Sequence, residues 1–207
     1  MTPDDGSPTV DDPLLVEIPV FEGFDELDAI GPYEVIVSGA DRGAPIDVSI
    51  VTLEPTDRVT ASHGLRVEPD GTLGEPDLLV VPGGGWSTAE GGVRRVIAEG
   101  QLPPAIAARH EAGATVASVC TGAMILAEAG LLADRPATTH QVALADLAAH
   151  ADVREARVVD DGDVLTAGGI TAGIDLALWL LEREFGSDLA AAVATELEHE
   201  RRGDVVR

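Results

Sequence analysis

The sequence predicts a single α/β domain in which a mostly parallel β-sheet is covered by helices on both faces. Short apolar runs alternate with segments of helical periodicity, which is typical of parallel strands joined by helical crossovers. The run at 78–81 is apolar at every position, as strands buried on both faces are. A chain of 207 residues also suffices for one domain whose core needs no metal or disulfide.

The first half of the chain contains three predicted strands, one long helix and a hairpin. Pro32 is compatible with the helix if the helix starts near it, and Gly39 lies close to its end. Glycines 83–85 form a tight loop after the third strand. The predicted segments are a strand at 14–21, a helix at 27–40, a strand at 46–54, a hairpin at 58–73 around His63 and Gly64, and a strand beginning at 77.

Helices dominate the second half of the chain. The last of them opens with Ser187 as the predicted N-cap. Residues 1–13 are expected to be a disordered acidic tail and 201–207 a short tail, so the predicted domain spans 14–200. The predicted segments are helices at 93–100, 103–113, 121–132, 141–150, 171–186 and 187–202, strands at 114–119 and 136–140, and a hairpin at 156–169.

The charge of the chain is strongly negative. Asp and Glu number 37 against 13 basic residues, all of them Arg, for a formal net charge of −24. This composition disfavours nucleic acid as a direct partner and predicts a halophilic protein, in which salt screens carboxylate repulsion. An ordinary acidic protein is the alternative. Because no signal peptide or membrane-length apolar segment is evident, we expect a cytoplasmic protein with no membrane contact.

Cys120 is the only cysteine, and it follows a predicted buried strand directly. A residue at a sharp strand-to-helix turn presents its side chain clear of the backbone, which is the nucleophile-elbow arrangement. We expect the amides of the following helix to lower the thiol pKa and, with those of 83–85, to bind an oxyanion. The alternative is a buried apolar cysteine. One cysteine excludes an internal disulfide and a paired-thiolate zinc site, and we predict no metal and no cofactor.

Three stretches carry a resemblance to a known family: VPGGGW at 81–86, SVCTGAMILAEAGLLADRPATTH at 118–140 and LTAGGITAGIDLALWLLE at 165–182. They resemble the ThiJ/PfpI superfamily, and most specifically its isocyanide hydratase branch and the sensor domains of AraC-type regulators. The resemblance extends from 14 to about 198. It implies a flavodoxin-like three-layer α/β sandwich, a homodimer, and an elbow cysteine contacted by an acidic residue.

The resemblance assigns catalytic roles to three residues. Cys120 matches the family nucleophile, and Asp28 in FEGFDELDAIGP matches the essential acid of the hydratases, where the deglycases have Glu. Helix capping is the alternative role for Asp28. Thr121 matches the residue after the hydratase nucleophile. Because the PfpI proteases have His there, protease activity is not expected.

The resemblance also implies residues around the thiol. Gly84, with Gly83 or Gly85 as alternatives, is the expected oxyanion donor. His140 matches a histidine near the deglycase thiol, or is a core or interface histidine. Ile170 and Thr171 match a segment that lines the hydratase pocket. Three other histidines are expected to lie at the surface: His63, His110 and His150. The acidic stretch at 198–200, which contains His199, is expected on a solvated helix face.

Together these residues predict a cysteine-dependent enzyme that resembles isocyanide hydratase and adds water to a small electrophilic substrate through a Cys120 adduct, with Asp28 as acid and base. A glyoxalase or deglycase acting on 2-oxoaldehydes is one alternative. A non-enzymatic sensor, in which Cys120 oxidises to a sulfinate, is another. A DNA-binding regulator is not expected, because only four residues follow Gly203.

Overall fold

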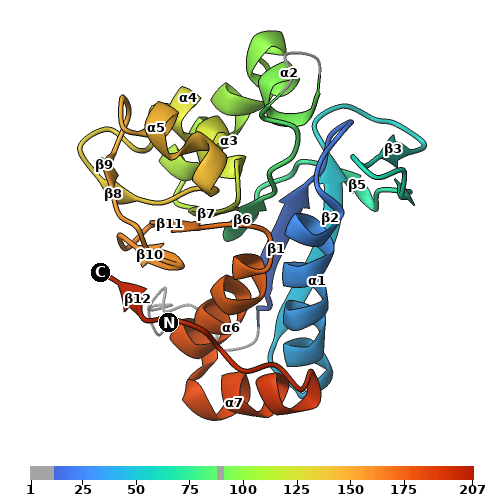
Figure 1. The fold of residues 1–207 in the computed structure, drawn as a ribbon. Coiled ribbons are helices and arrows are strands. Elements are labelled where there is room, and N and C mark those ends of the chain that lie inside the picture. Colours follow the sequence, from blue (N-terminus) through green and yellow to red (C-terminus); the bar gives the residue numbers. More distant parts are fainter. Residues whose placement is uncertain (1–11, 88–90) are drawn as a thin grey trace, which may run out of the picture.

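An eight-stranded sheet runs through the computed structural model, which describes residues 12–87 and 91–207 (Figure 1). Nearly all of the predicted acidic tail at 1–13 lies outside these ranges. The strands are β1 (Leu14–Pro19), β2 (Ile46–Thr52), β3 (Val59–Thr60), β4 (Arg66–Val67), β5 (Gly71–Thr72), β6 (Leu78–Val81), β7 (Thr115–Val119), β8 (Pro136–Ala137), β9 (Asp152–Val153), β10 (Val158–Asp160), β11 (Val164–Ala167) and β12 (Val205–Val206).

The strand order in the main sheet is β12-β10-β11-β7-β6-β1-β2-β5. Every neighbouring pair is parallel except the β10–β11 hairpin, so the predicted mostly parallel sheet is confirmed. The central strand β6 is continuously apolar and fully buried, and its neighbour β7 is buried from Val116 to Val119, because helices cover both of their faces. The short strands β3 and β4 pair separately as the predicted hairpin around His63.

Helices cover both faces of the sheet and complete the three-layer, flavodoxin-like sandwich (Figure 1). Helices α1, α6 and α7 pack together on one face, and α2, α3, α4 and α5 lie on the other. None of the helices in the described ranges has the length and hydropathy that a membrane span requires. The helices are α1 (Glu26–Asp41), α2 (Gly92–Glu99), α3 (Leu102–Glu111), α4 (Gly122–Glu128), α5 (Leu144–Leu147), α6 (Ala172–Phe185) and α7 (Ser187–Glu196).

Several predicted boundaries were wrong. The stretch at 201–207 is not merely a tail, because β12 pairs with β10 at the sheet edge and the Arg207 guanidinium lies 4.7 Å from the centre of the Trp179 ring. Ser187 is the first residue of α7, while Gly186 occupies the N-cap. Helix α1 begins six residues before Pro32, which therefore lies inside it. The segment at 141–150 forms only a 3₁₀ turn and the short α5.

The acidic surface makes a salt dependence testable. Among the described residues only Asp28, Asp160 and Asp175 are buried acids, so most of the charge of −24 faces solvent. Raising KCl from about 0.1 M to about 1 M shortens the screening length from about 10 Å to about 3 Å. We expect the midpoint of thermal unfolding to rise by roughly 10 °C over this range, measured by circular dichroism. An unchanged midpoint would contradict halophilic adaptation.

Candidate active site at the end of β7

Cys120 occupies a strained turn between β7 and α4. Its φ of 57° lies in the left-handed region, which residues other than glycine seldom adopt. The turn is fixed from several sides, since the Cys120 amide donates to the carbonyls of Ala167 and Gly168 at 3.1 and 2.9 Å. Its carbonyl accepts from Thr139 Oγ1 at 2.8 Å. The predicted nucleophile elbow is therefore present, and the Cys120 residue is 7% exposed.

The elbow packs tightly against the loop after β6, and two glycines make this possible. A Cβ on Gly122 would lie 2.3 Å from the Val81 carbonyl oxygen. A Cβ on Gly83 would lie 2.6 Å from the amide nitrogen of Thr121 and 2.8 Å from Asp28 Oδ2. Both contacts leave no room for a side chain, so the backbone itself brings the loop, the elbow and Asp28 together.

Asp28 projects from the first turn of α1 into this junction and is fully buried. Its Oδ2 accepts a hydrogen bond from the Gly83 amide at 3.0 Å. Its Oδ1 is buried and, within the described part of the chain, accepts no hydrogen bond from a nitrogen or oxygen donor. Capping of α1 falls to Asp25, whose Oδ1 accepts from the Leu27 amide at 3.2 Å, so the alternative capping role for Asp28 is wrong.

Asp28 and Cys120 contact each other and shift each other's proton affinity. Burial, reinforced by the charge of Asp25, raises the pKa of Asp28 to about 7, against opposing hydrogen bonds from Cys120 and the Gly83 amide. Burial and then the charge of Asp28 raise the pKa of the Cys120 thiol to about 12. The amides of Thr121 and Ile170 oppose this rise, but they do not cancel it.

The prediction that the pKa of the Cys120 thiol is lowered is therefore wrong. Helix α4 has only seven residues, and its amides do not offset the desolvation of a buried thiolate beside a carboxylate. A buried acid and thiol this close titrate as a pair. Because the pKa of Asp28 lies near neutrality, this carboxylate is suited to accept the thiol proton when a substrate enters.

The amides that interact with the thiol are only in part the predicted ones. The Gly84 amide donates to Thr121 Oγ1 at 3.0 Å and the Gly83 amide to Asp28, so both are already occupied. Gly85 is exposed in the same loop. The groups that interact with the sulfur are the amides of Thr121 and Ile170. Sequence reasoning placed Ile170 in the pocket wall and missed the role of its backbone.

His140 and Thr171 form their hydrogen bonds with residues outside the Asp28–Cys120 pair. His140 Nδ1 accepts the Val142 amide at 3.2 Å, and the ring borders a cavity of about 520 Å³ that Arg157 also lines. Thr171 is exposed, and its hydroxyl accepts from Arg157 at 3.1 Å. His140 is not among the described groups that shift the pKa of Cys120, so a direct effect on the thiol is not supported.

Three further histidines pair with carboxylates: His63, His199 and the partly buried His110, whose Nε2 lies 3.0 Å from Asp163 Oδ2. His63 is exposed, as predicted, and its Nδ1 lies 2.7 Å from Glu26 Oε2. With Asp25 these residues could surround an ion, but Glu26 already accepts the His63 ring and amide. His199 is not on a solvated helix face as predicted, because its Nε2 lies 2.9 Å from the buried Asp175.

Comparisons with known proteins agree with this fold. The sequence profile of the DJ-1/PfpI family matches residues 15–183. The isonitrile hydratase of Pseudomonas putida is 37% identical over 192 residues, which span 90% of this chain and 78% of that protein. Isonitrile is a synonym of isocyanide.

Two solved structures share the fold over most of its length. A ThiJ/PfpI family protein from Pseudomonas syringae superposes with a TM-score of 0.77 at 28% identity, covering 98% of this chain and 83% of that one. An AraC family transcriptional regulator from Pseudomonas putida superposes with a TM-score of 0.76 at 26% identity, covering 89% and 100% respectively.

Proposed function

Because this chain belongs to the DJ-1/PfpI family, we propose that it hydrates isocyanides to N-substituted formamides, with Cys120 as nucleophile and Asp28 as acid and base. The observation that carries the proposal is the buried Asp28–Cys120 pair at the elbow, with Thr121 next to it. The identity of 37% to an isonitrile hydratase supports this substrate class.

In the first half-reaction, the Asp28 carboxylate takes the thiol proton as the substrate enters. The Cys120 sulfur then forms a bond to the terminal carbon of R–N≡C, and Asp28 returns the proton to that carbon. The product is a thioimidate, Cys120–S–CH=N–R. The amides of Thr121 and Ile170 stabilise the sulfur while it carries negative charge.

In the second half-reaction, water supplies its oxygen to the thioimidate carbon and a proton to the nitrogen, with Asp28 transferring the proton. The tetrahedral adduct collapses as the C–S bond breaks and a C=O bond forms. The remaining hydroxyl proton passes to the sulfur, which restores the thiol and releases R–NH–CHO. One water is consumed in each cycle, and no oxidant or reductant is needed.

The alternative functions have weaker support. A glyoxalase or deglycase acting on 2-oxoaldehydes would use the same thiol, but Asp28 stands where the resemblance gives those enzymes Glu. His140 Nδ1 accepts the Val142 amide, and His140 is not among the described groups that shift the pKa of Cys120. Peroxide sensing also requires a thiolate, and because burial raises the pKa of Cys120 to about 12 it would need the same proton transfer to Asp28 as hydration does.

A substrate panel tests the proposal. The parent and Cys120→Ala are assayed in high salt with an aryl isocyanide, an alkyl isocyanide and methylglyoxal, following substrate loss by absorbance. We expect turnover of the isocyanides by the parent and no turnover by Cys120→Ala, because the nucleophile is missing. Faster consumption of methylglyoxal than of both isocyanides would favour the glyoxalase. Equal activity of the two proteins would refute a role for the thiol.

We also propose that the chain forms a homodimer through the groove between α1 and α6. This groove, of about 290 Å³, is lined by Leu27, Ile30, Ile174 and Leu197. Leu27 is 38% exposed although it adjoins the catalytic Asp28. An apolar surface beside an active site is suited to a second copy, which would complete the wall of the substrate pocket.

Leu27→Gln is expected to weaken this dimer. Each of the two copies loses the burial of one leucine, which contributes about 1.5 kcal/mol. The dimer therefore loses about 3 kcal/mol, and its Kd should rise about 100-fold. Light scattering coupled to size exclusion across a dilution series measures the change. Leu65→Gln is the matched control, because Leu65 is 46% exposed but lies outside the groove. A monomeric parent, or equal effects of the two variants, would contradict the interface.

A further inference from the structure

The turn between β11 and α6, residues 168–171, lies against the nucleophile. The Gly168 carbonyl accepts the Cys120 amide at 2.9 Å. Two residues further on, the Ile170 amide interacts with the Cys120 sulfur. This turn has to be held in place for the Ile170 amide to reach the sulfur.

Arg157, which directly precedes β10, contacts this turn at both of its ends. Its carbonyl accepts the Gly168 amide at 3.0 Å, and its Nη2 donates to Thr171 Oγ1 at 3.1 Å. Its Nε donates to Asp175, a buried carboxylate in the first turn of α6. The guanidinium therefore bridges two residues at the start of α6, while the Arg157 backbone continues into β10.

Asp175 is itself fixed by the end of the chain. Its Oδ1 accepts from His199 Nε2 at 2.9 Å and from the Arg202 amide at 3.2 Å. Its Oδ2 accepts from Arg157. The two oxygens of this buried carboxylate are thus satisfied by donors from two segments distant in the sequence. Asp175 is therefore a firm anchor for the Arg157 guanidinium.

Helix stability does not explain why Arg157 lies here. Thr171 is the N-cap of α6, where the partial positive charge of a helix disfavours a cation. The Thr171 side chain caps no amide of the helix, so its hydroxyl is available to Arg157. Arg157 is also not among the described groups that shift the pKa of Cys120. Its contribution to the elbow is therefore one of position rather than of charge.

We propose that Arg157 is a positioning residue for the turn at 168–171. By tying the start of α6 to β10, it keeps the Ile170 amide aligned with the sulfur of the nucleophile. This role rests on the proposed isocyanide chemistry, in which that amide stabilises the sulfur while it carries negative charge. A planar guanidinium can donate to Thr171 and Asp175 at once, whereas the single ammonium group of lysine cannot keep both bonds in this geometry.

Steady-state kinetics with an aryl isocyanide test the proposal. Thr171→Val removes the acceptor and Arg157→Lys removes the bridge, so each should lower kcat about tenfold and change KM by less than about twofold. Thr171→Ser, which keeps the hydroxyl, should recover most of the lost rate. The double variant Arg157→Lys/Thr171→Val should also lose only about tenfold, because both changes break one contact. Effects that multiply, or a change confined to KM, would overturn the proposal, since Thr171 would then act directly on the substrate.

Alkylation of Cys120 by iodoacetamide provides a readout that does not depend on the proposed substrate. Cys120 is the only cysteine, so the rate of alkylation at pH 9 reports on this thiol alone. Misplacing the Ile170 amide should slow alkylation about fivefold in Thr171→Val and in Arg157→Lys, because less thiolate forms. A merely loosened fold would instead expose the buried thiol and speed the reaction.

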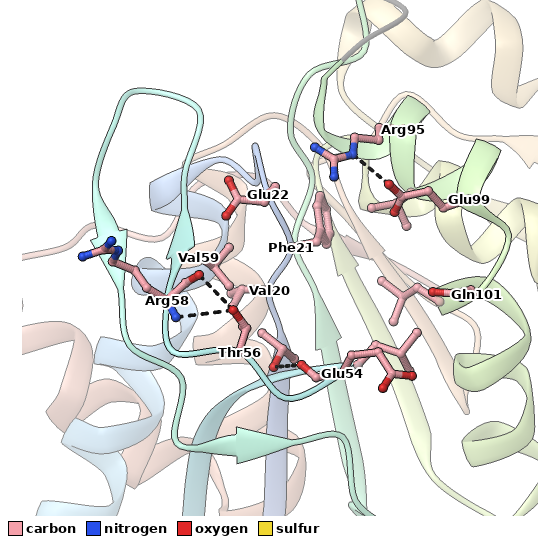
Figure 2. A pocket seen from close by; sticks show the side chains of 14 residues that line it. Val20, Phe21, Glu22, Glu54, Thr56, Arg58, Val59, Arg95, Glu99 and Gln101 are labelled. Atoms are coloured by element: carbon pink, nitrogen blue, oxygen red, sulfur yellow. Dashed lines mark hydrogen bonds and ion pairs between the residues drawn. The ribbon is translucent and has the colours of Figure 1, made fainter.

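Arg95→Lys is the matched control. Arg95 also binds a carboxylate through Nε, that of Glu99 at 2.8 Å, but it lines a separate cavity of about 240 Å³ (Figure 2). None of the described residues that line this cavity belongs to the Cys120 site, so kcat and alkylation should stay at the parent values. Unchanged or faster alkylation in Arg157→Lys, or an equal loss in Arg95→Lys, would overturn the proposal. Slower alkylation in Arg157→Lys, with no isocyanide turnover by the parent, would support the positioning role and refute only the substrate.

Discussion

Replacing Asp28 by asparagine is expected to lower the rate of isocyanide turnover by about 10²- to 10⁴-fold, the usual contribution of a general acid–base group. Asparagine keeps the shape of the side chain, and its carbonyl can still accept the Gly83 amide. It cannot take the proton from Cys120, however, and burial holds the pKa of that thiol at about 12 next to Asp28. Progress curves of isocyanide loss measure the effect directly.

The same substitution should stabilise the fold at alkaline pH. Below pH 3.8, the ordinary pKa, Asp28 is protonated in both the folded and unfolded chains. As the pH rises towards about 7, the unfolded chain ionises first, while the folded chain must bury the charge, so stability falls. Asparagine avoids this loss. We expect Asp28→Asn to raise the free energy of unfolding by about 2–4 kcal/mol at pH 8, and by much less at pH 4.

Asp25→Asn is the matched control for Asp28. Asparagine caps a helix as well as aspartate does, so α1 should be retained. The variant removes the charge that helps to raise the pKa of Asp28, so the pH profile of turnover should move to lower pH without a large loss of rate. Full activity in Asp28→Asn, or an equal loss in Asp25→Asn, would contradict the assigned role of Asp28.

The order of the elements and the position of the elbow could be predicted from the sequence, because both depend on local patterns. An apolar strand followed by Cys120 and then Gly122 places the thiol at the carboxyl end of a buried strand, and the family resemblance of the FEGFDELDAIGP stretch identifies Asp28. The proton affinity of the pair could not be predicted in this way. It depends on how deeply the two side chains are buried and on the charge of Asp25, which only the packed structure defines.

Contacts between distant segments could not be predicted from the sequence for the same reason. The Ile170 amide reaches the sulfur because β11 lies next to β7, and nothing in GGITAG marks a backbone donor. His199 pairs with Asp175 because the chain turns back after α7. The two valines of β12 are too few for a periodic signal, so their pairing with β10 was not predicted.

Gly122→Ala is expected to damage both stability and catalysis. The added methyl group would lie 2.3 Å from the Val81 carbonyl oxygen and 2.9 Å from that of Pro82, and neither atom belongs to a movable side chain. Either β6 or the elbow must shift. We expect a loss of about 3 kcal/mol or more in the free energy of unfolding, measured by urea denaturation. A shift of about 1 Å at the nucleophile should also lower turnover by about 100-fold.

Gly71→Ala provides the control for this prediction. Gly71 lies in β5, and a Cβ there would have no described atom within 4 Å. Its substitution should change stability by less than about 0.5 kcal/mol and leave turnover unchanged. If Gly122→Ala behaved in the same way, the close packing of the elbow on β6 would not be what positions Cys120. If Gly122→Ala lowers both stability and turnover while Gly71→Ala lowers neither, the backbone contact between β6 and the elbow supports the fold and also sets the position of the nucleophile.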